Sequence, residues 1–320
     1  MTSPRPFRFI APMPAIGRDP RAWTDQLRRI EDLGFDSVAI SEHLTGGWSM
    51  DALATMAAAA IATSRLRLLS LVLSNEFRHP VLLHRAAATI DVLSGGRLEL
   101  GLGTGWLAAD FAASGLPMAP IGTRIDRLAE AVTLIKDLFG PAPVTFPGAH
   151  YQIADLAGLP QPVQLPHPPI LIGGGGPRLL RLAAREADIV GIHARLDPAG
   201  IDAGTAVDLG PEAIAEKVGW VQAELERVGR SPAGVELQFS VYLTRIEDST
   251  RSAAATRSSF GAVLSANPQL VEESPAVLVG SLDRCVELLQ ERRERFGLSY
   301  WHLGHDVEAA ARIVSRLSGT

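Results

Sequence analysis

The hydrophobic residues of the chain fall into two patterns that alternate along its length. Some runs are short and almost continuously apolar, as buried strands are, whereas longer segments carry apolar residues at helical spacing. In the first helical segment Trp23, Leu27 and Ile30 share one face, and Gly34 follows as a C-cap residue. Eight runs are predicted as strands: Phe7–Ala11, Ser37–Ser41, Leu66–Leu73, Leu98–Leu102, Ile170–Ile172, Ile189–Ile192, Val235–Leu243 and Tyr300–Leu303.

Helical segments separate these strands, and their order predicts the fold class. Helices between successive strands force right-handed parallel crossovers, and strands without alternation are buried on both faces. Eight such units without a linker predict a single α/β domain over residues 1–320, a closed (β/α)8 barrel of the TIM type. An open doubly wound sheet is the competing architecture. The helices are predicted at Pro20–Leu33, Met50–Thr63, Val81–Leu93, Arg124–Phe139, Arg178–Glu186, Ser252–Leu264, Ser281–Arg295 and a last helix to about Leu317.

Two irregular segments interrupt this alternation. Gly140–Pro169 is rich in proline and is predicted as an ordered, non-helical excursion, and His193–Leu209 carries Gly200 and Gly204. We therefore expect insertions in the loops after strands 4 to 7, which are loops that often shape binding sites.

Composition and charge argue against several classes of protein. Thirty Lys and Arg against 35 Asp and Glu give a net charge of -5, with no basic face, so nucleic acid is not an expected partner. The longest weakly polar stretch, Ala52–Thr63, is shorter than the about 20 residues that cross a membrane. Residues 1–8 contain no apolar signal core, and the one cysteine, Cys285, suits a reducing compartment. We expect a cytoplasmic protein with a small-molecule substrate.

In a barrel the reactive groups lie at the carboxyl ends of the strands. His43 follows the second strand and could exchange a proton near neutral pH, and Glu42 beside it could order a loop or orient a partner. His43 and Glu42 are therefore the predicted catalytic residues. A histidine next to a carboxylate is also a common structural pair. Trp48 and Trp106 follow different strands and could line one cavity, as could His193 after the sixth strand. No metal triad is predicted, because the histidine spacings match no zinc signature.

Two glycine-rich segments follow the fourth and fifth strands. Four consecutive glycines, Gly173, Gly174, Gly175 and Gly176, precede a proline and Arg178. Glycine lets the backbone approach a ligand closely, and free N–H groups at a helix start attract an anion such as phosphate. A tight turn is the alternative interpretation. The segment from Gly101 through Gly103, Thr104 and Gly105 lacks the dinucleotide-binding spacing, which argues against a nicotinamide site.

These residues resemble the luciferase-like monooxygenase superfamily and, within it, the oxidoreductases that use the deazaflavin coenzyme F420. The resemblance covers nearly the whole chain and is specific. Its motifs are Ser41-Glu42-His43, Arg78-His79-Pro80, the run from Ala86 to Arg97, the run from Gly101 to Trp106, the segment Pro160–Pro169 before the glycine run, and Leu278-Val279-Gly280.

The resemblance implies a barrel with the cofactor ring at the carboxyl ends of the strands. A bulge with a non-proline cis peptide in the third strand would support the ring, and it would fall at Ser70-Leu71. The resemblance assigns His43 to proton transfer, and it places Trp48 and the turn from Gly103 to Trp106 near the ring or substrate. The glycine run would hold the cofactor phosphate.

The sequence departs from this family's pattern at three points. Trp106 stands where some deazaflavin dehydrogenases carry a glutamate, which argues against a mechanism like that of the sugar dehydrogenases. Glu42 replaces the usual aspartate. The only lysines, Lys136 and Lys217, are both predicted helical, so a phosphorylated substrate is not indicated.

The leading hypothesis is therefore an F420-dependent oxidoreductase that transfers a hydride between C5 of the deazaflavin and a small, largely apolar substrate. A flavin monooxygenase using reduced FMN and oxygen is the first alternative, and a non-catalytic flavin-binding or deazaflavin-binding protein is the second. The resemblance also implies a homodimer that pairs through helices near the second and third units, where the alanine-rich segment Ala57–Ala62 permits close packing.

Overall fold

A computed structural model describes residues 5–47, 50–263 and 268–320 of the chain. The chain divides into two compact units, each assembled from separate segments of the sequence. The first unit comprises Met1–Pro12, Arg29–Val38 and Gly174–Thr320, and the second comprises Met13–Arg28 and Ala39–Gly173.

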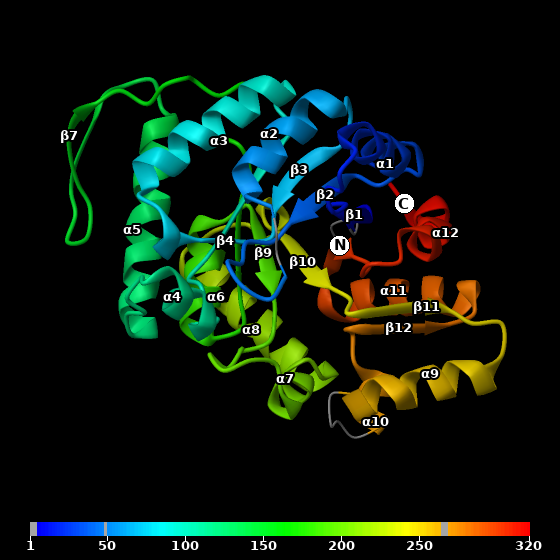
Figure 1. Cartoon of the computed structure of the whole chain (residues 1–320). Coiled ribbons are helices and arrows are strands. Elements are labelled where there is room, and N and C mark those ends of the chain that lie inside the picture. The colour runs from blue at the N-terminus through cyan, green and yellow to red at the C-terminus, as the bar shows by residue number, and fades with distance from the viewer. Residues whose placement is uncertain (1–4, 48–49, 264–267) are drawn as a thin grey trace. The chain divides into compact units, whose positions relative to one another are not determined.

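Each of the eight predicted helices is present, and the structure adds α4, α7, α8 and α10 to them (Figure 1). The strands are β1 Arg8–Pro12, β2 Ser37–Ile40, β3 Arg67–Ser70, β4 Leu73–Ser74, β5 Leu98–Gly103, β6 Val144–Pro147, β7 Gln152–Leu156, β8 Ile170–Gly174, β9 Ile189–Ile192, β10 Glu236–Ser240, β11 Leu243–Ile246, β12 Val277–Gly280 and β13 Leu298–His302. The α-helices are α1 Pro20–Asp32, α2 Ala52–Ala62, α3 Pro80–Ser94, α4 Ala108–Ser114, α5 Ile121–Phe139, α6 Pro177–Glu186, α7 Ala203–Asp208, α8 Pro211–Arg227, α9 Thr250–Val263, α10 Pro268–Glu273, α11 Leu282–Phe296 and α12 Val307–Leu317; short 3₁₀ turns cover Asn75–Phe77 and Pro232–Gly234.

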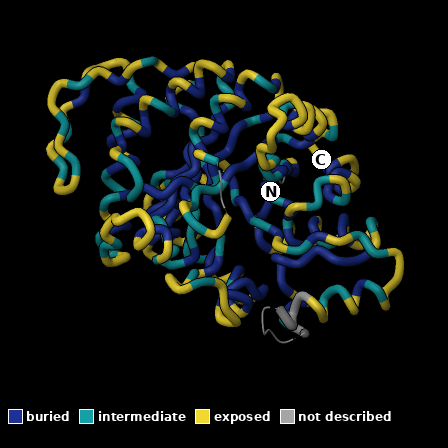
Figure 2. Tube along the Cα trace, viewed as in Figure 1, coloured by how far each residue is buried: buried dark blue, intermediate teal, exposed yellow. Residues whose placement is uncertain are grey.

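Parallel pairing joins the main strands within each unit. In the second unit β5 pairs with β3, β4 and β8, and Leu100 lies opposite Ile170. In the first unit β13 pairs with β1 and β10, and β10 pairs with β9. These strands are almost wholly buried (Figure 2), which explains their continuous apolar composition. The eight predicted strands are thus all present, and the third is split into β3 and β4.

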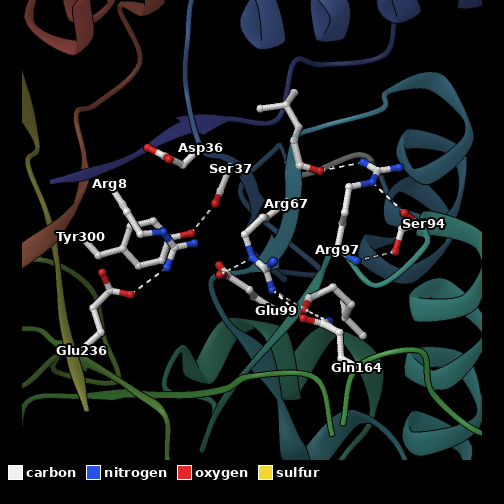
Figure 3. Close-up of polar contacts among 12 residues, drawn as sticks. Arg8, Asp36, Ser37, Arg67, Ser94, Arg97, Glu99, Gln164, Glu236 and Tyr300 are labelled. Atoms are coloured by element: carbon white, nitrogen blue, oxygen red, sulfur yellow. Dashed lines mark hydrogen bonds and ion pairs between the residues drawn. The ribbon is translucent and has the colours of Figure 1, made fainter. Parts of the chain in front are cut away.

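Polar side chains form a layer at the amino ends of the strands in each unit (Figure 3). In the second unit Arg67 donates to Glu99 at 2.6 Å and to Gln164 at 2.8 Å, and the Glu99 side chain is 1% exposed. In the first unit Arg8 donates to Glu236 at 2.7 Å. The buried carboxylates Glu99 and Glu236 are thus each paired with a partly exposed arginine, as buried charges usually are.

The predicted insertions follow three of the four strands named for them. After β5 the chain forms α4, α5 and the hairpin β6–β7, which stands away from α5 in Figure 1. After β9 it forms α7, a six-residue helix that the sequence analysis missed, and after β10 come the β11–β12 ribbon, α9 and α10. The fifth predicted strand corresponds to β8, and the insertion predicted after it is absent. Pro177 starts α6 directly after β8.

Two histidines with lowered pKa values predict how stability depends on pH. Burial lowers the pKa of His84 in α3 and of His302 in β13, each to about 4. Between pH 6.5 and 4 the unfolded chain binds protons that the folded chain does not, so stability falls as the pH falls through this window. His84 is 2% exposed, and its share is at most about 3 kcal/mol. His84→Gln should therefore flatten the decline of the urea midpoint between pH 6.5 and 4, and an unchanged slope would contradict this assignment.

Candidate active site

A histidine and an aspartate meet at the carboxyl ends of β2 and β5 in the second unit. His43 follows β2, Asp110 lies in the first turn of α4 after β5, and His43 Nδ1 is 2.7 Å from Asp110 Oδ2. The His43 side chain is 17% exposed, whereas that of Asp110 is 3% exposed. The pair therefore has a buried carboxylate behind a partly accessible imidazole.

Asp110 is held by more than the imidazole. Its Oδ1 accepts from the Leu44 amide at 3.1 Å, the Thr45 amide at 2.9 Å and the Thr45 hydroxyl at 2.6 Å. Burial alone would raise the pKa of Asp110, but the hydrogen bonds from Thr45, His43 and Leu44 hold this pKa below its ordinary value. An ionised Asp110 accepts a hydrogen bond from the Nδ1–H group of His43, which fixes the imidazole tautomer and leaves proton exchange with a ligand to Nε2.

Trp106 packs against the same imidazole. The two rings meet edge to face, with centroids 5.9 Å apart and planes at 88°. Trp106 thus limits the rotation of His43 and contributes an apolar wall next to it. Trp48, the other predicted wall residue, lies outside the described residues.

Glu42 joins the end of β2 to the segment after the bulge. Its carboxylate accepts from the Ser74 amide at 2.9 Å and forms an ion pair with Arg78. The Glu42 side chain is 6% exposed. Adjacent residues point to opposite sides of an extended chain, so Glu42 orders the loop while His43 faces its own partner.

The bulge that the resemblance implies lies between β3 and β4. The non-proline cis peptide joins Leu71 and Val72, one residue beyond the predicted Ser70-Leu71 bond. The Leu71 amide donates to the Ile40 carbonyl at 2.8 Å, and the Ser41 hydroxyl donates to the Leu71 carbonyl at 2.9 Å. These two bonds connect the bulge to the strand that presents His43.

Glycine in β5 makes room for this bulge. A Cβ at Gly101 would lie 1.8 Å from the Ser70 carbonyl oxygen, and one at Gly103 would lie 2.7 Å from the Val72 side chain. Gly105 has φ +67 and would meet the Ser74 hydroxyl at 2.6 Å. The glycine spacing, which the sequence left without a structural reason, follows from this close approach. Thr104 between them is buried.

Buried polar atoms follow the bulge. Among the described residues, Ser74 Oγ, Asn75 Oδ1 and Glu76 Oε1 have no hydrogen-bond partner. Buried polar groups are normally satisfied, so unpaired oxygens in three successive residues fit a segment that receives polar contacts from a bound molecule. The residues around the bulge therefore fit a ligand with polar edges.

The tetraglycine segment forms the turn between β8 and α6. A Cβ at Gly175 would lie 2.3 Å from the Ala194 backbone, whereas a Cβ at Gly176 would meet no atom within 4 Å. Gly174 is covered by Leu179, and Gly173 by Val72 and Leu171. Gly176 caps α6 at its amino end, Pro177 occupies the first turn, and Arg178 is exposed. Gly176 is thus the glycine of this turn that borders open space.

His193 pairs with a residue that the sequence analysis did not select. Its Nδ1 is 3.2 Å from the Ala194 carbonyl, and its Nε2 is hydrogen-bonded to the Tyr242 hydroxyl. Burial lowers the pKa of His193. A neutral imidazole that donates from Nδ1 accepts from Tyr242 at Nε2, so these two residues form one polar group in the first unit.

Within the described residues, no group of three or more His, Cys, Asp or Glu side chains could hold a metal ion. Within the same residues, no helix combines the length and apolar character needed to cross a membrane. Cys285 is buried in α11, and burial raises the pKa of its thiol to about 11, as expected for a packing residue.

Comparison with solved structures defines the fold. An F420-dependent secondary alcohol dehydrogenase in complex with an F420-acetone adduct superposes with a TM-score of 0.77 at 18% identity, covering 98% of each chain. The coenzyme F420-dependent tetrahydromethanopterin reductase of Methanopyrus kandleri gives 0.75 at 18% identity, covering 98% of this chain and 97% of that one. The predicted closed (β/α)8 barrel of the TIM type is confirmed.

Comparison of sequences places the chain in a family. The family model for luciferase-like monooxygenase matches residues 6–265, and the chain belongs to that family. The F420-dependent glucose-6-phosphate dehydrogenase of Intrasporangium calvum is 36% identical over 53% of this chain and 52% of that protein. The enzyme of that name from Kineococcus radiotolerans is 32% identical over 71% of this chain and 65% of that protein. The chain thus spans about half the length of the first curated relatives it matches.

Proposed function

We propose that this protein is an F420-dependent oxidoreductase that transfers a hydride between the deazaflavin C5 and a small organic substrate. The observation that carries the proposal is the imidazole of His43, held by the buried Asp110 at the end of β2. The relatives named as F420-dependent dehydrogenases support the choice of cofactor. When bound, the deazaflavin supplies the hydride donor or acceptor, and the protein supplies orientation and the proton.

The residues present fit this cofactor. We assign Ser70, Leu71, Gly103, Thr104 and Gly105 to the ring, because the bulge and the glycines opposite it shape the backbone there. We assign Gly173 to Gly176 and Arg178 to the phosphate, because glycine N–H groups at a helix start attract an anion. The unpaired oxygens after the bulge suit the polar edge of a deazaflavin.

His43 is the one residue to which we assign a catalytic role. Its Nε2 donates or accepts the proton that accompanies hydride transfer, and Asp110 positions the ring and stabilises its charged form. Glu42, predicted as a second catalytic residue, is better assigned as a positioning residue, because Ser74 and Arg78 engage its carboxylate. Trp48, Trp106 and His193 remain the proposed substrate-pocket residues.

The substrate that we propose is an unphosphorylated alcohol or carbonyl compound. Lys217 cannot bind a phosphate, because its side chain is 1% exposed and its Nζ is 2.8 Å from Asp208. Lys136 lies in the last turn of α5. Neither lysine is therefore proposed to bind a substrate phosphate.

Fluorescence titration with oxidised F420, reduced F420 and FMN tests the proposal directly. We expect binding of F420 and turnover with 2-propanol in preference to glucose 6-phosphate. Oxygen uptake with reduced FMN and substrate would instead establish the flavin monooxygenase. Absence of binding by either form of F420 would reject the proposal.

We also propose that the protein is a cytoplasmic homodimer. The α2–α3 face supports the dimer, because a groove there is lined by Leu53, Ala54, Ala57, Leu82, Arg85, Ala86, Thr89 and Ile90, and because Leu82 is 63% exposed. The single free cysteine suits a reducing compartment.

A further inference from the structure

Three polar side chains lie at the carboxyl ends of adjacent strands in the first unit. The strand β10 pairs with both β9 and β13, and Ser240 at its end lies opposite His302. His193 directly follows β9, and its imidazole is hydrogen-bonded to Tyr242, which lies two residues beyond β10. The Val241 amide donates to the His302 carbonyl at 2.8 Å, which keeps the chain beside Tyr242 next to β13. His193, Tyr242 and His302 are therefore neighbours at the end of a barrel that carries reactive and binding groups.

Tyr242 offers a bound molecule an acceptor rather than a donor. His193 Nδ1 lies 3.2 Å from the Ala194 carbonyl, which only accepts, so the imidazole proton is on Nδ1. His193 Nε2 then accepts from the Tyr242 hydroxyl and engages its one proton. The phenolic oxygen keeps its lone pairs, and Tyr242 is 38% exposed. A ligand group that donates a hydrogen bond therefore fits this oxygen.

His302 offers the complementary donor. The Gly304 amide donates to its Nδ1 at 3.3 Å, so the proton of the neutral imidazole lies on Nε2. Within the described residues, no acceptor is hydrogen-bonded to this Nε2. Burial lowers the pKa of His302 to about 4, so the ring is uncharged near neutral pH. His302 thus presents one N–H group and no positive charge.

The charges near His193 are paired with one another. Burial lowers the pKa of His193, and the charge of Lys217 lowers it further. Asp208 forms ion pairs with Lys217 at 2.8 Å and with Arg195 at 3.1 Å. An anion bound beside the neutral imidazoles would be desolvated without gaining a cation, which is costly. The surroundings therefore favour an uncharged polar group.

We propose that Tyr242 and His302 bind a second hydroxyl group of the substrate, an inference that rests on the proposed function. A hydroxyl both donates and accepts, so it donates to the Tyr242 oxygen and accepts from the His302 Nε2–H group. An ionised carboxylate only accepts, so it would place an acceptor against the Tyr242 oxygen. His193 is the positioning residue, because it holds the Tyr242 proton. The substrate class is a secondary alcohol with a further hydroxyl, or the corresponding hydroxy ketone.

The direct test measures kcat/KM of the full chain with F420 for diols and for matched alcohols. Three pairs vary the separation of the two hydroxyls: butane-1,3-diol with 2-butanol, pentane-1,4-diol with 2-pentanol, and hexane-1,5-diol with 2-hexanol. In the best-fitting pair we expect the diol to exceed its alcohol by about tenfold, as one or two neutral hydrogen bonds would give. The carboxylate analogue 4-hydroxypentanoate should show no such gain over 2-pentanol.

Tyr242→Phe is the sharpest variant, because it removes the hydroxyl and keeps the ring. The preference for the diol should fall to within about twofold of one. His302→Leu should also lower the preference, since it removes the donor. Tyr300→Phe is the matched control: it removes a buried hydroxyl that is hydrogen-bonded to Ser37 at the start of β2, and the diol preference should be retained.

Nitrogen chemical shifts of the imidazoles provide a readout that does not depend on turnover. Adding the best-fitting diol should shift the His302 Nε2 signal of the wild type, and the matched alcohol should not. Equal kcat/KM within every pair would overturn the hydroxyl site, and so would a diol preference that survives in Tyr242→Phe. Turnover of none of these alcohols with F420 would overturn the proposed function. In that case a shift of the His302 signal by a diol would still support the hydroxyl site, and the absence of a shift with all three diols would reject it.

Discussion

Replacing His43 with glutamine should lower kcat by about a thousandfold, because a positioned general acid or base contributes roughly two to four orders of magnitude. Glutamine keeps a polar group in the loop but cannot exchange a proton. The Kd for oxidised F420 should change by less than about threefold, because the substitution impairs proton transfer and not cofactor binding. Single-turnover kinetics with the best substrate, alongside fluorescence titration of the cofactor, measure both quantities.

Asp110→Asn refines this expectation. The asparagine oxygen should stay with the Leu44 and Thr45 donors, which turns its amide NH2 toward Nδ1 of His43. The amide NH2 of the variant and the Nδ1–H group of His43 would then both be donors. The imidazole is therefore expected to carry its proton on Nε2, so that Nδ1 accepts from the amide. We expect kcat to fall by about a hundredfold or more. Nitrogen chemical shifts of the imidazole would show the altered tautomer.

Glu42→Gln is the matched control for both variants. It changes the residue next to His43 but leaves the His43–Asp110 hydrogen bond intact, and its main cost is the ion pair with Arg78. We expect a lower unfolding midpoint and a fall in kcat of less than about tenfold. A loss in Glu42→Gln as large as that in His43→Gln would return Glu42 to the catalytic role first predicted from the sequence.

The sequence was sufficient to predict the strands but not the contacts between their ends. Continuous apolar runs identify buried strands because periodicity is a local property. The break after Ser70 is invisible to that pattern, since Leu71 is apolar like its neighbours. The strand is interrupted there by the cis peptide bond between Leu71 and Val72. A local pattern of apolar residues carries no information about such a backbone feature.

Asp110 was missed for a related reason. It lies 67 residues from His43, in a short helix whose other residues are ordinary helix formers. No spacing rule links the two positions, because only the parallel arrangement of the strands brings them together. A search for carboxylates in the first turn after each strand would have found Asp110, since an acid there also suits the helix dipole.

The helix α7 was missed because glycine weakens helix signals. Gly200 and Gly204 indicate an irregular loop, yet Asp202 accepts from the Thr205 amide at 2.9 Å and starts a helix with a capping box. The cap offsets the low propensity of glycine over six residues. The capping residues Asp202 and Thr205 therefore predict this helix better than the glycine content of the segment does.

Gly101→Ala should destabilise the protein by at least about 3 kcal/mol, because overpacking against a backbone atom cannot be relieved by a side-chain rotation. The added Cβ would lie 1.8 Å from the Ser70 carbonyl oxygen, so β5 or the bulge must move. Movement would also strain the reciprocal hydrogen bonds between Ser70 and Gly101, at 2.7 and 2.9 Å. Urea denaturation followed by circular dichroism measures the loss. We expect weaker F420 binding by the folded fraction as well, since the bulge is the proposed support for the ring.

The control for this variant is the same substitution at Gly219, in the middle of α8. A Cβ there would meet no atom within 4 Å, and alanine is the better helix former. Gly219→Ala should therefore raise stability by about 0.5 to 1 kcal/mol, opposite in sign to Gly101→Ala. The two substitutions add the same methyl group, so a difference in sign isolates the close approach of Ser70 as the cause. If Gly101→Ala unfolded at the urea concentration of the wild type, the bulge could not be packed against β5 as described.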